Sequence, residues 1–212
     1  DQPERVRANL SRALAAVDLS AASLSQVWQV HSAEIIRADS PNGAGSPLKA
    51  DGMVTAQPAL SLLMRFADCV PILMFDPVRI AIGVGHAGWL GTVRGVSIEL
   101  VRAMVREFSS RPEDLIAGLG PSIGPDHYPV GPDVVAQVEA AFGAHSSQFL
   151  LPREGQVVLD LWSANRWQLE STGIGSVEVA GICTACNLAD WYSHRGERGQ
   201  TGRFGAVLAL NA

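Results

Sequence analysis

The sequence predicts an α+β domain, because segments with strand character outnumber those with helical character and several strands follow one another directly. Apolar residues make up 47% of the 212 residues and charged residues only 17%, so the chain can bury a substantial core. This composition excludes a disordered chain, which cannot bury enough apolar surface to offset the entropy cost of ordering. We therefore expect one domain that spans residues 1–212.

Four strands are predicted in the first half of the chain. Apolar segments at 27–36 and 60–66 predict the first two. A near-continuous apolar run over 69–76 predicts a third strand that is buried on both faces. The fourth covers 80–85 and ends at His86.

A long helix is predicted from about residue 92 to residue 109, because its apolar side chains recur every three or four positions. Thr92 suits the N-cap, since its hydroxyl can accept a hydrogen bond from a free amide of the first turn. Between the first two strands, the Gly-, Pro- and Ser-rich segment 39–49 predicts a long surface loop.

Shorter elements are predicted in the second half. Pro132 suits the first position of a helix and Gly143 suits its exit, which predicts a helix over 132–142. A further helix is expected at 163–172, ended by Gly173. The predicted strands are 115–119, 157–162, 177–182 and 204–210.

The charge balance excludes several classes of partner. Lys and Arg number 16 against 21 Asp and Glu, and no basic stripe of the kind that binds nucleic acid is visible. The longest apolar run, 69–75, is far below the ~20 residues needed to cross a bilayer, and no signal-peptide pattern opens the sequence. Three cysteines do not form a disulfide framework. The sequence therefore predicts a cytoplasmic protein without nucleic-acid or membrane partners.

Three motifs resemble known sites but lack a confirming feature. Gly83-Val-Gly85-His-Ala-Gly88 matches a dinucleotide-binding loop, but no acidic residue ends the next strand, which favours a tight turn. Gly120-Pro-Ser122-Ile-Gly124, with Asp160 and His194 further on, has the order of a serine hydrolase. Prolines follow this serine where a nucleophile elbow needs a helix, so a backbone turn is favoured.

The third motif is Cys183-Thr-Ala-Cys186, which can be a redox dithiol or half of a zinc site. No second C-x-x-C exists and the nearest histidine along the chain is His194, so a pair of partly buried thiols is the favoured interpretation. His127 and His145 lie in loop or helix-end segments and give no sign of clustering with other ligands.

A fourth constellation is not contiguous. His31, Cys69 and His86 each lie at or just beyond the end of a predicted strand. Two imidazoles and a thiolate are good zinc ligands, and three protein ligands leave one position open for water or substrate. These residue types also occur at strand ends simply as packing residues, so a shared metal site is one of two interpretations that spacing alone leaves open.

The same segments carry a family resemblance. The sequence resembles the laccase-domain family, once described as multicopper polyphenol oxidoreductases and now as FAMIN-type purine nucleoside phosphorylases. The matching stretches occur in family order over residues 26–210: Gln29-Val-His31, Ala50-Asp-Gly-Met-Val-Thr55, Ala67-Asp-Cys-Val-Pro71, Gly85-His-Ala-Gly-Trp89, Gly120-Pro-Ser-Ile-Gly-Pro125, Cys183-Thr184 and Thr201-Gly-Arg203.

The resemblance implies a mixed β-sandwich with helices on the outside, layered α/β/β/α, and one Zn²⁺ bound by His31, Cys69 and His86. It also implies phosphorolysis of purine nucleosides, including methylthioadenosine, and deamination of adenosine. The substrates would then be purine nucleosides and phosphate, and a monomer is favoured. Asp68 is the candidate proton donor to the departing purine, or else it orients a metal-bound histidine. Thr201 and Arg203 are candidate phosphate contacts, or else parts of a solvated loop.

The sequence departs from the family pattern at three places. Leu90 stands where the family usually has arginine, although Arg94 lies one helical turn away. Ser122 replaces a cysteine, and Ser193-His194-Arg195-Gly196 replaces a Ser-Tyr-Arg-Arg stretch, so the register of any anion contact there is open.

Three alternative functions stay open. Cysteine with two histidines also suits copper, which would make the protein a polyphenol oxidase, although a multicopper oxidase needs more imidazoles than the five histidines here. Cys69 and His86 can also serve without metal as the nucleophile and base of a thiol hydrolase. A non-catalytic module with a structural metal is the last alternative, although such sites normally have four protein ligands.

Overall fold

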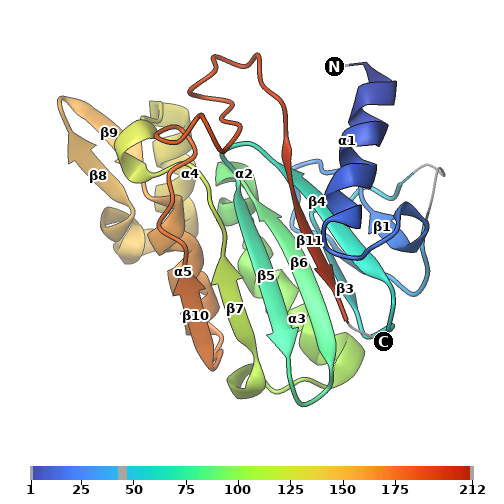
Figure 1. Ribbon diagram of the computed structural model, residues 1–212. Coiled ribbons are helices and arrows are strands. Elements are labelled where there is room, and N and C mark those ends of the chain that lie inside the picture. The colour runs from blue at the N-terminus through green and yellow to red at the C-terminus, as the bar shows by residue number, and fades with distance from the viewer. Residues whose placement is uncertain (1, 43–46, 211–212) are drawn as a thin grey trace.

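The computed structural model describes residues 2–42 and 47–210, and the part of the predicted loop at 43–46 lies outside the described residues. Two mixed β-sheets pack face to face, with helices on both outer sides (Figure 1). This arrangement confirms the predicted α/β/β/α layering.

The larger sheet has six strands in the order β10-β7-β5-β6-β3-β2. The inner pairs β7/β5, β5/β6 and β6/β3 are antiparallel. The outermost pairs, β10/β7 and β3/β2, are parallel. The strands are β2 (Ile35–Arg37), β3 (Gly52–Thr55), β5 (Val70–Asp76), β6 (Ala81–Ala87), β7 (Ile116–Leu119) and β10 (Ser176–Val179).

The smaller sheet has three strands in the order β1-β4-β11, with β1 parallel and β11 antiparallel to β4. Its strands are β1 (Leu24–Gln26), β4 (Ser61–Phe66) and β11 (Phe204–Ala209). A separate hairpin is formed by β8 (Leu150–Arg153) and β9 (Gln156–Leu159).

Five α-helices and four short 3₁₀ helices are formed within the described residues. The α-helices are α1 (Pro3–Ala15), α2 (Trp89–Val93), α3 (Val96–Phe108), α4 (Pro132–Phe142) and α5 (Leu161–Ser171). The 3₁₀ helices are η1 (Ala21–Ser23), η2 (Pro112–Asp114), η3 (Pro125–His127) and η4 (Gly143–Gln148).

Three clusters of buried apolar side chains hold the layers together. One lies between the two sheets and includes Met53, Leu62 and Val84. A second lies between the six-stranded sheet and the helices α3, α4 and α5 on its other face. The third packs Leu14 of α1 against Leu24 and Leu63 of the small sheet, which explains why α1 stands outside that sheet in Figure 1.

The predicted strand over 27–36 is wrong for most of its length. The chain leaves the small sheet after β1 and joins the large sheet only at β2, so the intervening residues form a crossing connection. His31 takes a left-handed backbone conformation there, with φ 57°, which is incompatible with an extended strand.

The predicted helix over 92–109 is divided in two. Gly95 takes φ 78° and breaks the helical path between α2 and α3. Thr92 therefore lies inside α2 instead of capping the helix, and its hydroxyl accepts a hydrogen bond from Asn165 of α5 at 2.9 Å. The predicted helix over 132–142 and its exit at Gly143 are confirmed.

The start of α5 gives a test of local stability. Asp160 accepts a hydrogen bond from the Ser163 amide at 3.0 Å and is the N-cap of this helix, whose inner face is buried. Asp160→Ala is expected to cost about 1 kcal/mol because the amide loses its partner. The melting temperature should fall by roughly 2–4 °C in thermal unfolding. Asp160→Asn keeps an acceptor and should lose less; an equal loss would contradict a capping role.

Candidate metal centre

The candidate site lies at one end of the sandwich, where two connections cross from the small sheet to the large one. The first crossing connection, between β1 and β2, carries His31, and the second, between β4 and β5, carries Cys69. His86 is the next-to-last residue of β6 and pairs with Pro71, two residues after Cys69. The sequence places these residues far apart, and the sheet pairing brings them to one edge.

The three side chains converge. One ligand atom from each of His31, Cys69 and His86 lies within 4.8 Å of the other two. The imidazole rings of the two histidines meet edge to face, with their centroids 5.0 Å apart. Two nitrogens and one sulfur around a tetrahedral zinc ion lie about 3.3–3.6 Å from one another, so a modest inward movement of these side chains suffices to bind an ion. The donor set of one sulfur and two nitrogens fits zinc and also fits copper.

The Cys69 thiol has a lowered pKa. Burial alone would raise this pKa, but the imidazoles of His86 and His31 outweigh burial and lower it to about 6. The pKa of His86 is raised to about 9, because the Cys69 thiolate and the Asp51 carboxylate favour its charged form more than burial disfavours it. Cys69 and His86 therefore favour a thiolate beside an imidazolium. A bound metal requires the thiolate but a neutral imidazole, so metal binding would release the proton from the His86 Nε2.

Asp51 orients His86 and the segment of His31 through hydrogen bonds. Its carboxylate is fully buried and accepts a hydrogen bond from the His86 Nδ1 at 2.9 Å, which leaves Nε2 as the free ligand atom of that ring. The amides of Val30, His31 and Ser32 donate to the same carboxylate at 3.1, 3.0 and 2.6 Å. Burial alone would raise the pKa of Asp51, but the hydrogen bonds from His86 and from the amide and hydroxyl of Ser32 lower it to about 2.

The hydrogen bonds to Asp51 explain how His31 keeps an unfavourable backbone conformation. A left-handed φ costs a non-glycine residue free energy, and such residues persist where their surroundings over-determine them. The His31 amide is held by Asp51, and its carbonyl accepts a hydrogen bond from the Arg94 guanidinium at 2.6 Å. Arg94 therefore lies beside the site, as its position one turn after Leu90 predicts.

The sequence did not single out Asp51, although this residue lies in one of the stretches that carry the family resemblance. Its only distinguishing signal is a carboxylate placed directly before the buried strand β3. An aspartate in an apolar context is expensive to bury unless it is hydrogen-bonded, and the donors that satisfy it come from a distant part of the chain.

Asp68 is buried and holds the segment between β10 and β11 against the site. Its carboxylate accepts hydrogen bonds from the Thr184 hydroxyl at 2.7 Å and from the Arg195 amide at 2.6 Å. The partner that orients His86 is Asp51, so the second role expected for Asp68 belongs to a different carboxylate. In Figure 1 this segment, drawn from orange to red, runs over the top end of the sheets.

Thr201 and Arg203 lie near this end but make local contacts. The Thr201 hydroxyl donates to Glu197, and the Arg203 guanidinium donates to the carbonyl of Gly202 at 2.7 Å. The next residue, Phe204, stacks on Phe66, whose ring centroid is 5.5 Å from that of His86. No contact joins Thr201 or Arg203 to the three candidate ligands among the described residues.

Tyr128 lies near the Cys69 thiol and Arg195 lies against Tyr128, and the sequence assigns neither residue a role. Burial and the nearby Cys69 thiolate raise the pKa of Tyr128, so its hydroxyl stays protonated. The Arg195 guanidinium lies over the Tyr128 ring, 4.9 Å from its centroid, and donates to the Pro129 carbonyl at 3.0 Å. An aromatic wall and a cation thus stand beside the candidate metal centre.

Two of the contiguous motifs have structural roles. Gly83 and Gly85 lie within β6, where a Cβ would meet Leu100 of α3 at 3.2 and 3.3 Å, so they let the helix pack on the sheet. The buried Ser122 hydroxyl accepts a hydrogen bond from Trp162 at 2.6 Å and has no histidine partner among the described residues. The expectation that His127 stands apart is wrong, because its imidazole lies with Cys183 and Cys186.

Gly88 allows the two crossing connections to approach. A Cβ at this position would lie 2.8 Å from the Cys69 Sγ and 3.2 Å from the His31 Cδ2. Gly88→Ala is therefore expected to displace both side chains and weaken metal binding by about tenfold or more, since changes around a metal site have effects of roughly this size. Competition with a chelating dye measures the affinity. Gly118→Ala in β7, where a Cβ meets nothing within 4 Å, is the matched control and should bind metal normally.

The fold and the centre define a sandwich protein with a candidate Cys/His metal site at one end. The chain belongs to the family described as multi-copper polyphenol oxidoreductase laccase, which it matches over residues 1–211. It is 40% identical over 210 residues to a protein of Deinococcus radiodurans named purine nucleoside phosphorylase, covering 99% of this chain and 79% of the relative. It is 37% identical to purine nucleoside phosphorylase YlmD of Geobacillus stearothermophilus, covering 85% of this chain and 69% of that protein.

The fold agrees with a solved structure. The crystal structure of the Bacillus licheniformis hypothetical protein YfiH superposes with a TM-score of 0.94 at 33% identity, covering 100% of this chain and 83% of that one. Across residues 2–42 and 47–210, no helix of this protein has the length and apolar character needed to traverse a bilayer.

Proposed function

We propose that this protein is a zinc-dependent purine nucleoside phosphorylase, which converts adenosine or inosine and phosphate to the free base and ribose 1-phosphate. The observation that carries the proposal is the convergence of His31, Cys69 and His86 around one point, with His86 oriented by the buried Asp51. The relatives named purine nucleoside phosphorylase support the same reaction.

His31, Cys69 and His86 would hold the ion, which when bound supplies positive charge to orient phosphate and neutralise its oxygens. Arg94 and Arg195 add positive charge from the protein, because their guanidinium groups are held at the edge of the site by backbone carbonyls. Thr201 and Arg203 are the proposed further phosphate contacts, and binding would require Arg203 to exchange its bond to the Gly202 carbonyl for one to phosphate.

The departing purine needs a proton. As the bond between C1′ and the purine nitrogen breaks, its electron pair passes to the base, and a phosphate oxygen forms the new bond to C1′. Asp68 is the proposed proton donor or shuttle. Asp68→Asn tests the role: loss of turnover that is equal for nucleosides with good and poor leaving bases would contradict it, because an acid matters most for the poor ones.

Two further activities are proposed for the same centre, namely phosphorolysis of methylthioadenosine and deamination of adenosine. For deamination, the ion held by His31, Cys69 and His86 would supply the charge that activates water as the nucleophile in place of phosphate. An adenosine assay separates the reactions, since deamination gives inosine without phosphate whereas phosphorolysis gives adenine only with phosphate. Absence of inosine would remove the deaminase activity and leave the phosphorylase proposal intact.

The experiment that tests the main proposal pairs metal analysis with an assay. Protein purified without added metal should contain zinc, and base release from adenosine should depend on phosphate. Removal of the metal with a chelator should abolish turnover, and zinc should restore it. Phosphate-independent base release, or full activity after verified removal of metal, would overturn the proposal.

A metal-free thiol hydrolase is the second candidate function. The lowered pKa of Cys69 and its contact with His86 favour it, since a thiolate beside an imidazole is the arrangement of cysteine nucleophiles. Metal-free protein whose Cys69 is alkylated with loss of an esterase or amidase activity would support it. A copper-dependent polyphenol oxidase is the less favoured alternative, because the five histidines are shared among separate places and no more than two lie in either candidate metal group.

A further inference from the structure

A second group of metal-binding side chains lies outside the candidate centre described above. It consists of His127, Cys183 and Cys186, whose ligand atoms all lie within 4.8 Å of one another. His127 is the last residue of η3, and the two cysteines belong to the Cys183-Thr-Ala-Cys186 motif. The third ligand that this motif lacked in the sequence is supplied by folding, from a position 56 residues before Cys183.

The distances within this group match a tetrahedral zinc site. The His127 Nδ1 is 3.8 Å from the Cys183 Sγ and 3.6 Å from the Cys186 Sγ. With zinc about 2.3 Å from sulfur and about 2.0–2.1 Å from nitrogen, tetrahedral geometry places S and N about 3.6 Å apart. The imidazole therefore needs almost no movement relative to either sulfur to share an ion, and the two sulfurs lie within 4.8 Å of each other. Both cysteines are free thiols.

A backbone amide points at the Cys183 sulfur. The Gly124 amide donates a hydrogen bond to the Cys183 Sγ at 3.2 Å. A Cβ at Gly124 would lie 3.4 Å from the same sulfur, so glycine permits this close approach. Such an amide–sulfur bond gives an observation independent of the clustering of ligands.

Backbone pairing holds the two segments together before any ion binds. The Ser122 amide donates to the Ile182 carbonyl and the Thr184 amide donates to the Ser122 carbonyl, both at 3.1 Å. Ser122, five residues before His127, is thus hydrogen-bonded to the residues on either side of Cys183. Since the scaffold is already ordered, little entropy remains to be lost when an ion binds.

We propose that His127, Cys183 and Cys186 form a second metal site, which binds one Zn²⁺ through an imidazole and two thiolates. Binding releases the two thiol protons, and the two thiolate charges neutralise the ion. The fourth position faces solvent and takes water, because His127 and Cys186 are exposed. This site does not depend on the proposed phosphorylase activity.

The expected effect of the second ion is to tie η3 to the 183–186 turn. Thr184 in that turn donates to Asp68, and Tyr128 directly after His127 lies near the Cys69 thiolate. The site therefore supports two of the contacts that flank the first centre. It is a positioning element, and its presence is measured by metal content and not by turnover.

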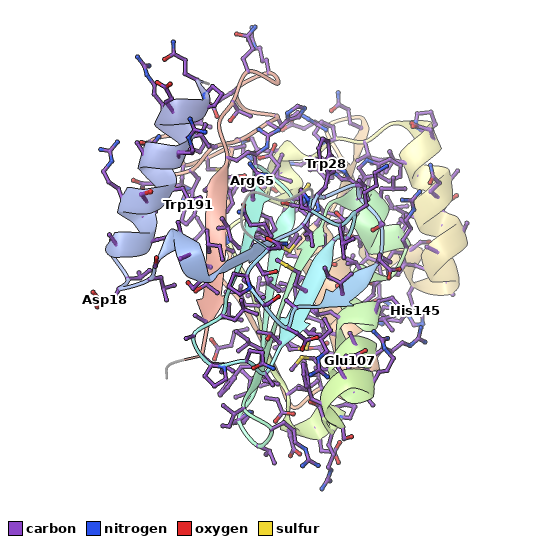
Figure 2. All side chains as sticks on the ribbon, turned by 90° about the vertical axis from the view of Figure 1, so that its right-hand side faces the viewer. Asp18, Trp28, Arg65, Glu107, His145 and Trp191 are labelled. Atoms are coloured by element: carbon purple, nitrogen blue, oxygen red, sulfur yellow. The ribbon has the colours of Figure 1, made fainter. Side chains whose placement is uncertain are left out.

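Metal analysis of the full chain, purified under reducing conditions in zinc-containing buffer, tests the proposal. Wild-type protein should hold about two zinc ions, and both Cys69→Ser and the double variant Cys183→Ser/Cys186→Ser about one. His127→Ala should lower the affinity of the second site by about tenfold or more. His145→Ala is the matched control, because it removes another exposed imidazole, labelled in Figure 2, that belongs to neither group of ligands. This variant should keep both ions.

Cobalt substitution gives a readout that survives if Cys69→Ser does not fold. The wild-type spectrum should show thiolate-to-cobalt absorption from both sites, and the double variant should lose the larger share, because two of the three sulfur ligands are removed. One zinc ion in wild-type protein that is lost entirely in Cys69→Ser would overturn the proposal. A Cys183–Cys186 disulfide in the reduced preparation, with no second ion, would also overturn it and would identify a redox pair.

Discussion

Replacing Cys69 with serine is expected to lower phosphate-dependent base release from adenosine by at least about a hundredfold. The thiolate is the only sulfur among the three candidate ligands and the only one that brings negative charge to them. Changes to residues that only support a metal ligand already cost about 10–100-fold in affinity or activity, so loss of a ligand should cost at least as much. Initial rates and bound zinc, measured on the same preparation, check the result.

Matched variants separate loss of the ion from loss of the fold. His31→Ala should have the same effect as Cys69→Ser, because His31 contributes an equivalent ligand atom from the other crossing connection. His145→Ala should retain full turnover, since His145 is exposed and contacts Gln148 and Trp167 instead. The assignment of the site would be contradicted if folded Cys69→Ser protein kept zinc at the first centre and full activity.

The second large effect is expected at Asp51. Asp51→Ala removes the acceptor for the amides of Val30, His31 and Ser32. A buried donor left unpaired costs about 1–3 kcal/mol. The three amides are only part-buried, so the lower end of this range applies, and their sum of about 3 kcal/mol is still a large fraction of the stability of a typical domain. We expect much less folded protein, and chemical denaturation with urea gives the change in the free energy of unfolding.

Asp51→Asn keeps the fold testable. Its carbonyl oxygen accepts some of the same bonds, but the neutral amide neither raises the basicity of the His86 ring nor fixes its orientation as a carboxylate does. This variant should fold, with zinc affinity lowered by about 10–100-fold. Unchanged zinc affinity in folded Asp51→Asn protein would mean that the carboxylate serves only the backbone of the crossing connection.

Much of the fold can be predicted because the strands buried in the sandwich are apolar runs, which are recognisable from the sequence alone. The strand β4 and the helix α4 match their predictions within a residue. The break at Gly95 cannot be predicted from the sequence, because the apolar periodicity continues across it. The break depends on the contact of α2 with α5, which is distant in the sequence. The absence of a strand over 27–34 likewise depends on Asp51, a partner 20 residues away from His31.

The candidate ligands were accessible to sequence reasoning for a different reason. His31, Cys69 and His86 are metal-binding residue types that the sequence places near strand ends. The structure brings them together at one end of the sandwich, where His31 and Cys69 lie on the connections between the two sheets. His127 escaped, because its partners come from a turn 56 residues later, and no local pattern marks a pair that only long-range backbone contacts bring together. The prediction of one domain over residues 1–212 stays a prediction.

His31 and Cys69 belong to connections that leave one sheet and enter the other. An ion shared between them is a cross-link that the unfolded chain cannot form, since its ligands meet only after the sheets have docked. Zinc should therefore slow the separation of the sheets far more than it speeds their assembly. The kinetic lifetime of the native protein would then follow the availability of the metal.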